Sequence, residues 1–333
     1  MGPLCTGVPT FAPLRSTAVA QGLVMRSTGS RYRVRAEDGS VHDCVAKGNL
    51  RIKGYTSTNP IAVGDRVEFE PQRNAEEVGA VTALHDRKNY IVRRSVNLSH
   101  HKHVIAANLD QALLMATVAS PRTSCGFIDR FLVTAEAYSV PCVLLLNKVD
   151  ALDEDERALL EEYRAAYELA GYRVVLTSAR TGTGVQEVKD LLKGKVTLVA
   201  GHSGVGKSTL VNAIDPSLDL DTQEISEASD KGQHTTTFAE MFELQADVPT
   251  FIIDTPGVKG FGLVDMTPDE IVDQFPELFK LKGECRFNDC KHMNEPGCAV
   301  KRAVEAGAVA TSRYRSYVDM VNGVEDDGPY RLD

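Results

Sequence analysis

The chain has 333 residues, of which 43% are hydrophobic and 25% are charged, a composition typical of a globular protein with two or three domains. Its net charge of −9 argues against a uniformly basic nucleic-acid binder, and no apolar run reaches the length of a membrane span. The charge is uneven, because residues 1–110 carry fifteen Lys and Arg against ten Asp and Glu, whereas the remainder carries twenty-two against thirty-six. The seven cysteines, four spread along the chain and three clustered near its C-terminal end, do not resemble a disulfide framework. We therefore expect a protein of the reducing cytoplasm, with no membrane contact and a basic N-terminal third.

Residues 1–18 lack a pattern and are expected to form a disordered tail. Short β-type runs follow, separated by turns rich in Gly, Ser and Asp: Gln21–Met25, Tyr32–Ala36, Val41–Ala46, Arg66–Phe69 and Ala80–Leu84. This spacing predicts a small closed barrel, an OB-fold, over residues 19–86. Its basic side chains favour an RNA-facing surface, with ordinary solvated charge as the alternative: Arg31, Arg33, Arg35, Arg51 and Lys53.

A basic connector, residues 87–108, leads into an α/β domain that we expect over residues 109–262. Its first strand is predicted at Leu109–Val118, and amphipathic helices are predicted at Phe127–Tyr138 and Glu154–Leu169. Apolar strands that alternate with such helices are typical of an α/β fold.

Two motifs at strand ends predict which base is bound. The strand expected at Pro141–Leu146 ends in Asn147-Lys148-Val149-Asp150, and the strand at Arg173–Leu176 ends in Thr177-Ser178-Ala179. The Asp150 carboxylate can accept hydrogen bonds from the N1–H and the 2-amino group of guanine, a pair of donors that adenine lacks. Asn147 suits the purine N7 side, and the Lys148 stem can lie along the base. The backbone N–H groups of Ser178 and Ala179 suit the guanine O6, so the motifs predict GTP over ATP.

The apolar run Val196–Ala200 is followed by a complete G-x-x-x-x-G-K-[ST] phosphate loop: Gly201, His202, Ser203, Gly204, Val205, Gly206, Lys207, Ser208 and Thr209. The glycines let backbone N–H groups surround a phosphate chain, and the helix that begins at Lys207 adds its positive dipole. Lys207 would reach the β- and γ-phosphates in a catalytic role, and the Ser208 hydroxyl would hold Mg²⁺.

A polar, acidic segment at Asp215–Asp230 and the motif Gly232–Thr237 suit a mobile switch loop. Within it, Thr236 would complete the Mg²⁺ shell when the γ-phosphate is present. Strands predicted at Phe238–Leu244 and Thr250–Ile253 lead to Asp254-Thr-Pro-Gly257. There Asp254 would hold the metal through water and the Gly257 N–H would sense the γ-phosphate.

The base motifs precede the phosphate loop, whereas an ordinary GTPase begins with the phosphate loop and ends with the base motifs. We therefore predict a circular permutation. It is physically allowed because the site is built from loops at strand ends, whatever order the chain visits them.

The C-terminal segment, residues 263–333, carries three thiols and one imidazole within fourteen residues: Cys285, Cys290, His292 and Cys298. This donor set predicts a closed tetrahedral Cys₃His site for one structural Zn²⁺, with reduced cysteines beside a chance histidine as the alternative. Helices predicted at Ala299–Ala306 and Ser312–Val321 would surround it. Their arginines are expected to be exposed: Arg302, Arg313 and Arg315.

In this order the motifs NKVD, TSA, GHSGVGKST, GQHTTT and DTPG, preceded by a small barrel and followed by C-x4-C-x-H-x5-C, resemble the ribosome small-subunit-dependent GTPase A (RsgA) family. The likeness extends to Val63–Val67 and Glu295–Cys298, and it departs at His202, where we would expect Gln. It implies an OB-fold, a permuted GTPase and a zinc domain that bind the small (30S) ribosomal subunit late in its maturation, through 16S rRNA. Ribosome-stimulated GTP hydrolysis would then release the protein, which is expected to be monomeric when free.

Val258 stands where many GTPases place a glutamine that orients the attacking water, so slow intrinsic turnover is expected. The family's GxHTTT motif suggests His234 as a substitute that the ribosome brings into place; alternatively, His234 caps or packs the loop. Two other functions remain open. One is an RNA-binding module in which GTP fixes the shape and hydrolysis is incidental, and the other is a GTPase that serves a different RNA, such as tRNA.

Overall fold

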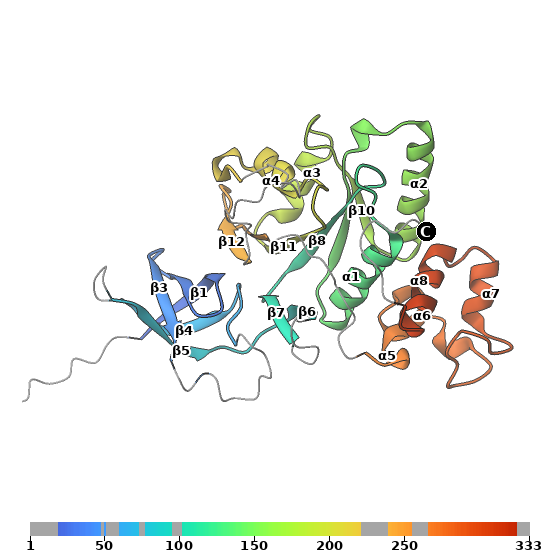
Figure 1. Ribbon diagram of the computed structural model, residues 1–333, viewed down its shortest axis with the longest axis horizontal. Helices are drawn as coiled ribbons and strands as arrows, with labels where there is room; N and C mark the ends of the chain where they lie inside the picture. Colours follow the sequence, from blue (N-terminus) through green and yellow to red (C-terminus); the bar gives the residue numbers. More distant parts are fainter. Residues whose placement is uncertain are drawn as a thin grey trace, which may run out of the picture.

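The computed structural model describes residues 19–47, 50, 60–72, 77–94, 102–220, 239–254 and 266–324. The predicted tail and several predicted site residues lie outside these ranges: residues 1–18, Arg51, Lys53, His234, Thr236, Gly257 and Val258. A barrel (blue) lies on one side of a central α/β domain, and a helical domain (orange to red) lies on the other (Figure 1). The predicted fold class is confirmed: a barrel, a permuted α/β domain and a mostly α C-terminal domain.

Five strands form the barrel: β1 (Ala20–Ser27), β2 (Tyr32–Ala36), β3 (Val41–Ala46), β4 (Arg66–Glu70) and β5 (Gly79–Leu84). Strand β1 pairs with both β2 and β4, and β3 runs parallel to β5, which closes the ring in the order of an OB-fold. Alternate side chains point inward, so Val24, Val34 and Phe69 lie in its core. The predicted limits of β2 and β3 match the structure because turn residues bound each alternating run.

The predicted connector contains a β-hairpin, formed by β6 (Tyr90–Arg94) and β7 (Lys102–Ala107). The barrel turn at Val63–Asp65 rests on it, and a side chain at Gly64 would lie 2.1 Å from the Ala107 carbonyl oxygen. Only glycine permits this approach, at a φ of 89°. Beside it, the buried Arg87 guanidinium donates to both carboxylate oxygens of Asp65 at 2.7 Å. A buried joint therefore attaches the barrel to the α/β domain.

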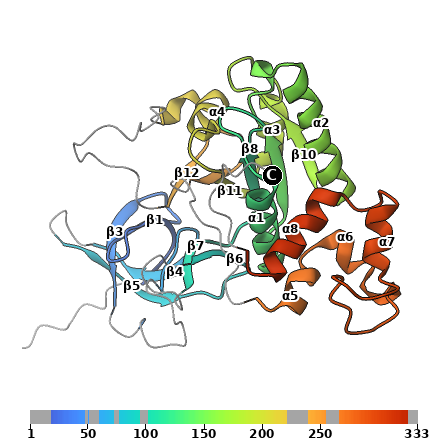
Figure 2. The ribbon, with the colours of Figure 1, turned by 45° about the vertical axis from the view of Figure 1, so that its right-hand side comes forward.

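The central sheet contains β8 (Gln111–Ala116), β9 (Cys142–Leu146), β10 (Arg173–Leu176), β11 (Val196–Ala200), β12 (Glu240–Glu243) and β13 (Phe251–Asp254). Its order is β10-β9-β8-β11-β13-β12, and only the edge pair β13–β12 is antiparallel. Strand β12 also pairs with β1, so the barrel and the α/β domain share one continuous sheet (Figure 2). Every residue of β8 is buried, and Ala112–Ala116 accordingly form a continuous apolar run rather than an alternating one.

Helices cover both faces of this sheet. Helices α1 (Cys125–Ala137) and α2 (Glu154–Leu169) pack on one face, and α3 (Val185–Leu192) and α4 (Lys207–Ile214) pack on the other. Because the five central strands are parallel, their carboxyl ends lie at one edge. The loops with the base motifs, the phosphate loop and Asp254 meet at that edge, although the chain reaches the base motifs first.

The C-terminal domain consists of α5 (Pro268–Asp273), α6 (Pro276–Phe279), α7 (Ala299–Glu305) and α8 (Thr311–Val321). Phe275, Leu278 and Tyr317 form its core together with Cys290 and Cys298. No helix in the described part of the chain combines the length and the apolar character that a membrane crossing requires.

The prediction that Arg313 is exposed is wrong. Its side chain is 1% exposed, and its guanidinium donates to Glu277 of α6 at 2.8 Å and to Asp129 of α1 at 2.7 Å. The same guanidinium lies over the ring of Phe275, 4.6 Å from its centroid. Two carboxylates and an aromatic face compensate the buried charge, so this arginine fastens the C-terminal domain to α1. Arg302 and Arg315 are exposed, as expected.

Candidate functional site

The phosphate loop joins β11 to α4, and α4 begins at Lys207 as predicted. Gly206 precedes the helix at a φ of 96°, and a Cβ there would lie 2.6 Å from the Asn147 amide nitrogen. Glycine is therefore required on both conformational and steric grounds. Part of the motif is accessible to solvent: Ser203 and Thr209 are exposed, and Gly204 and Ser208 are half-exposed. The rest of the loop is largely buried, at Gly201, His202 and Val205.

The Lys207 ammonium donates to the carbonyl oxygens of Gly201 and His202, at 2.8 and 3.0 Å. Burial lowers the pKa of Lys207, and the nearby Asp254 carboxylate opposes that shift. Because β11 and β13 are parallel with Val199 opposite Asp254, this carboxylate lies beside the phosphate loop. A hydroxyl at Ser208 and a carboxylate at Asp254 are the oxygen ligands that Mg²⁺ prefers, so the residues present fit that ion.

Asn147 connects the base motif to the phosphate loop. Its amide nitrogen donates to the Val205 carbonyl oxygen at 2.8 Å, and its amide oxygen accepts from the Thr177 hydroxyl at 3.0 Å. Asn147 is 3% exposed and Thr177 is fully buried. Asn147 and Thr177 therefore hold the phosphate loop in place at Val205.

The Asp150 carboxylate lies at the exposed edge of the base motif. It accepts from the Ser178 hydroxyl at 2.5 Å and from the Arg180 Nε at 2.8 Å. The Ser178 hydrogen bond, followed by the Arg180 contacts, lowers the pKa of Asp150. The group is an ionised acceptor, as guanine recognition requires. Sequence reasoning missed Arg180, and its position directly after Ser178-Ala179 was the available signal.

Lys148 adopts a left-handed backbone with a φ of 63°, and its ammonium donates to the Ser120 carbonyl oxygen at 2.7 Å. The Val149 N–H donates to the Thr177 carbonyl oxygen at 3.3 Å, which joins the two base motifs. The structure therefore brings together at one sheet edge every described residue of the predicted nucleotide site.

Two of the predicted RNA-facing arginines of the barrel, Arg33 and Arg35, lie close to carboxylates of the α/β domain. Arg33 is 3.7 Å from Glu240 and Arg35 is 3.0 Å from Glu243, both on β12. Arg26 lies 3.9 Å from Glu240, and Arg31 is exposed at the start of β2. Part of this basic surface therefore contributes to the contact between barrel and α/β domain.

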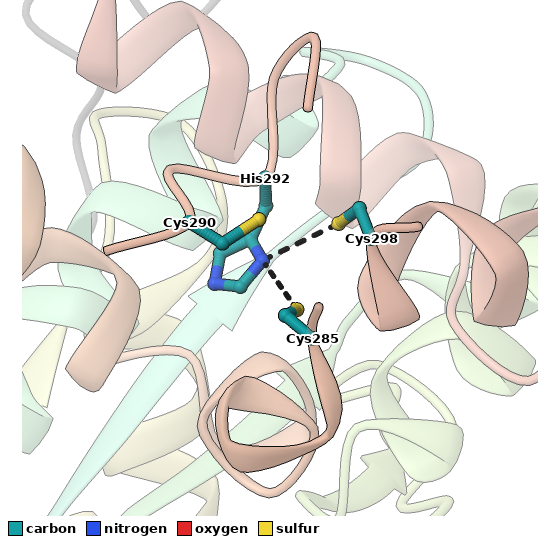
Figure 3. A group of neighbouring side chains, drawn as sticks. All are labelled: Cys285, Cys290, His292 and Cys298. Atoms are coloured by element: carbon teal, nitrogen blue, oxygen red, sulfur yellow. Dashed lines mark hydrogen bonds between the residues drawn. The ribbon is translucent and has the colours of Figure 1, made fainter. Parts of the chain in front are cut away.

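The four predicted zinc ligands converge in the C-terminal domain (Figure 3). Their donor atoms all lie within 4.8 Å of one another, and the His292 Nδ1 lies 3.4 Å from the Sγ atoms of both Cys285 and Cys298. Tetrahedral Zn²⁺ with ligand bonds of about 2.0–2.3 Å holds its ligand atoms in this range, so the set fits one ion. The Ala299 N–H donates to the Cys285 Sγ at 3.3 Å, an interaction that stabilises a thiolate.

A carboxylate orders the turn that carries His292. Glu295 accepts from the backbone N–H groups of Lys291, Met293 and Asn294, at 2.9 to 3.0 Å. These hydrogen bonds lower the pKa of Glu295, whose burial acts in the opposite direction as the largest single influence. Tyr314 donates to the His292 carbonyl oxygen at 2.6 Å, which fixes the ligand turn on α8. Hydrogen bonds from Glu295 and Tyr314 therefore fix the conformation of the turn that carries His292.

Two family models match the chain, one over the barrel and one over the hairpin and the α/β domain. Residues 21–79 match the model of the RsgA N-terminal domain, and residues 84–264 match that of the RsgA GTPase. The chain is 51% identical to the small ribosomal subunit biogenesis GTPase RsgA of Christiangramia forsetii, over 94% of this chain and 98% of the relative. It is 52% identical to the RsgA protein of Bacteroides fragilis, over 93% and 99% of the two chains.

Two solved structures share this architecture. YjeQ from Thermotoga maritima is 35% identical with a TM-score of 0.72, over 92% of this chain and 99% of that one. YloQ, described as a circularly permuted GTPase, is 26% identical with a TM-score of 0.68, over 94% and 98%. These likenesses extend over the barrel, the α/β domain and the C-terminal domain alike.

Proposed function

The chain belongs to the RsgA family of GTPases, and from this membership we propose that it acts in the biogenesis of the small ribosomal subunit. GTP hydrolysis is the activity of the family, and the site has the parts for it. The observation that carries the proposal is the joint assembly, at one sheet edge, of a phosphate loop and an ionised Asp150 beside Ser178.

Each predicted part of the site receives a role in this proposal. Asp150, Lys148 and the backbone at Ser178 and Ala179 select guanine, and Asn147 supports the loop that holds the phosphates. Ser208 and Asp254, with Thr236 from the switch, would hold Mg²⁺, which would supply charge neutralisation for the β- and γ-phosphates. Lys207 leaves the carbonyl groups it contacts here and stabilises the charge that develops on the transferred phosphoryl group.

We further propose that hydrolysis is slow in the free protein and is stimulated by the small subunit. Val258 offers no group that orients water, and His234 is the candidate that the ribosome would place against the γ-phosphate. Neither residue lies within the described ranges. The GTP-bound form would bind 16S rRNA through the barrel, and hydrolysis would release the protein, a monomer of the cytoplasm, from the subunit.

Zn²⁺ has a structural role in this proposal. Cys285, Cys290, His292 and Cys298 fill all four positions of a tetrahedral ion, which leaves none for a substrate. The ion would hold together a domain whose described helices are at most eleven residues long.

GTP turnover by the purified protein, alone and with purified small or large ribosomal subunits, tests the proposal. We expect a rise of at least about tenfold with small subunits only, in keeping with partner-activated GTPases. Lys207→Ala should abolish it. Lys193→Ala is the matched control, because this exposed lysine lies at the opposite end of β11. Within the same assay, His234→Ala tests the proposed water-orienting role.

Two results would redirect the proposal. Tight GTP binding with no stimulation by either subunit would leave a GTP-gated RNA-binding module. Stimulation by free RNA, without ribosomal protein, would point to a different RNA partner.

A further inference from the structure

The segment between β8 and α1, residues 117–124, is a part of the nucleotide site that no motif marks; we name it the β8–α1 loop. It contacts both nucleotide-binding loops. The Ser120 carbonyl oxygen accepts from the Lys148 ammonium of the base motif at 2.7 Å. The Thr123 hydroxyl lies 2.6 Å from the Nε2 of His202 in the phosphate loop. Thr123 is fully buried and His202 is 1% exposed, so water does not compete for this hydrogen bond.

The partners of these two side chains determine where the hydrogens lie. His202 Nδ1 is 2.9 Å from the Ser203 carbonyl oxygen, which only accepts, so Nδ1 carries a hydrogen. Burial lowers the pKa of His202, and the ring is therefore neutral with a bare Nε2. The Thr123 hydroxyl accepts from the Thr117 N–H at 3.0 Å and donates its own hydrogen to Nε2. The Thr123 hydroxyl and both ring nitrogens of His202 therefore each have a hydrogen-bond partner.

The β8–α1 loop is itself held firmly. The Tyr163 hydroxyl donates to the Thr123 carbonyl oxygen at 3.1 Å, and the Thr117 hydroxyl bonds to the Pro121 carbonyl oxygen. Ser124 caps α1 by accepting from the Phe127 N–H at 3.2 Å. The Phe127 ring meets the His202 ring edge to face, with centroids 5.7 Å apart. His202 therefore rests on a fixed support rather than on a mobile loop.

We infer that Thr123 and His202 are positioning residues that hold the phosphate loop in its nucleotide-binding shape. The inference rests on the proposed nucleotide site. Asn147 holds the second half of the loop through the Val205 carbonyl oxygen. Thr123 and His202 hold the first half, and turn the Ser203 carbonyl oxygen toward the imidazole. The backbone N–H groups of a loop held at both points are ready for phosphate before it arrives, which lowers the ordering cost of binding.

Thr123→Val tests this inference in the full-length protein, because valine keeps the shape and removes the hydroxyl. The probe is a fluorescent GDP, with its dissociation rate and equilibrium constant measured together with the thermal unfolding of the nucleotide-free protein. We expect dissociation about tenfold to a hundredfold faster, the range for a buried partner left unsatisfied. Thr123→Ser restores the hydroxyl and should restore the wild-type rate.

Thr250→Val is the matched control. Thr250 is also buried, its hydroxyl accepts from the Gly194 N–H at 3.0 Å and donates to the Val248 carbonyl oxygen at 2.8 Å, and it precedes β13 at the opposite edge of the sheet. We expect this variant to lower thermal stability without changing GDP dissociation. A Thr123→Val protein that melts earlier but releases GDP at the wild-type rate would overturn the inference.

His202→Phe provides a second, independent variant, because it keeps a ring beside Phe127 and cannot accept from Thr123. If the two side chains act as one unit, the double variant releases GDP no faster than the faster single variant. Additive effects would contradict the inference. Failure of the wild-type protein to retain GDP would instead refute the nucleotide site on which the inference rests.

Discussion

The two outer domains are attached to the α/β domain by arginines and carboxylates, in opposite environments. On the barrel side, Arg26, Arg33 and Arg35 meet Glu240 and Glu243 of β12, with side chains 23% to 46% exposed. On the other side, Arg313 meets Asp129 and Glu277, and the three side chains are at most 7% exposed. The same chemistry therefore serves two different kinds of contact.

Burial decides what each contact can do. Exposed ion pairs contribute about 0–1 kcal/mol and weaken as salt is added, so the side-chain part of the contact between the barrel and β12 is adjustable. A buried pair leaves an uncompensated charge when one partner is removed, at a cost of about 3–5 kcal/mol, so the C-terminal domain is fixed to α1. On the barrel side a buried ion pair is also present, between Asp65 in the barrel turn and Arg87 just after β5.

The two contacts also differ in where they lie relative to the nucleotide site. Strand β12 begins directly after the segment predicted to contain the switch loop, and it lies between β1 of the barrel and β13, which ends at Asp254. The adjustable contact therefore lies on the strand between the barrel and the γ-phosphate side of the site. The fixed contact lies on α1, on the face of the sheet that α2 also covers.

Metal removal should have the largest effect, because the C-terminal domain is expected to depend on its zinc ion for folding. Zinc sites in small domains contribute about 10–16 kcal/mol of apparent binding free energy at pH 7, and the described core around Cys290 and Cys298 is small. We expect Cys298→Ser, or treatment with a chelator, to unfold the C-terminal domain while the α/β domain persists. Hydrogen exchange of α8, with metal content per chain, measures this. Cys142→Ala is the control, and equal protection of α8 with and without metal would contradict the prediction.

Arg313→Ala should have the next largest effect, because it leaves Asp129 and Glu277 buried without their partner. We expect a loss of about 3–5 kcal/mol, concentrated in the contact between α8 and α1. Denaturant unfolding followed by hydrogen exchange on α1 and α8 measures it. Arg315→Ala, two residues along the same helix and exposed, should change stability by less than about 0.5 kcal/mol. Similar losses of unfolding free energy in the two variants would contradict the prediction that the buried contact matters more than exposed charge.

The double substitution Glu240→Gln and Glu243→Gln should have the smallest effect, since it removes only exposed charge pairs. We expect a loss below about 1 kcal/mol at low salt and no loss at about 0.5 M salt, where the Debye length is only a few ångströms. Thermal unfolding at both salt concentrations checks this. A loss that persists at high salt would show that the barrel contact is as firm as the Arg313 contact.

Local patterns in the sequence predicted many of the strands and helices, but they missed β6, β7, α3, α5 and α6. The limits predicted for β2, β3 and α2 match those of the structure, because alternation, turn residues and helical periodicity are short-range signals. The phosphate loop, the base motifs and the four zinc ligands were also recognisable, since each is a fixed spacing within a short stretch. The boundaries predicted between domains stay predictions.

What the sequence determined by itself was therefore the set of parts: a barrel, a permuted nucleotide site and a Cys₃His cluster. Tertiary structure alone decided how they join. The Thr123–His202 hydrogen bond connects residues 79 apart, and the Arg313–Asp129 pair connects residues 184 apart. It also placed a hairpin in the predicted connector and paired β1 with β12. Hydrophobic periodicity and motif spacing describe neighbours along the chain, whereas these contacts exist only because folding brings distant segments together.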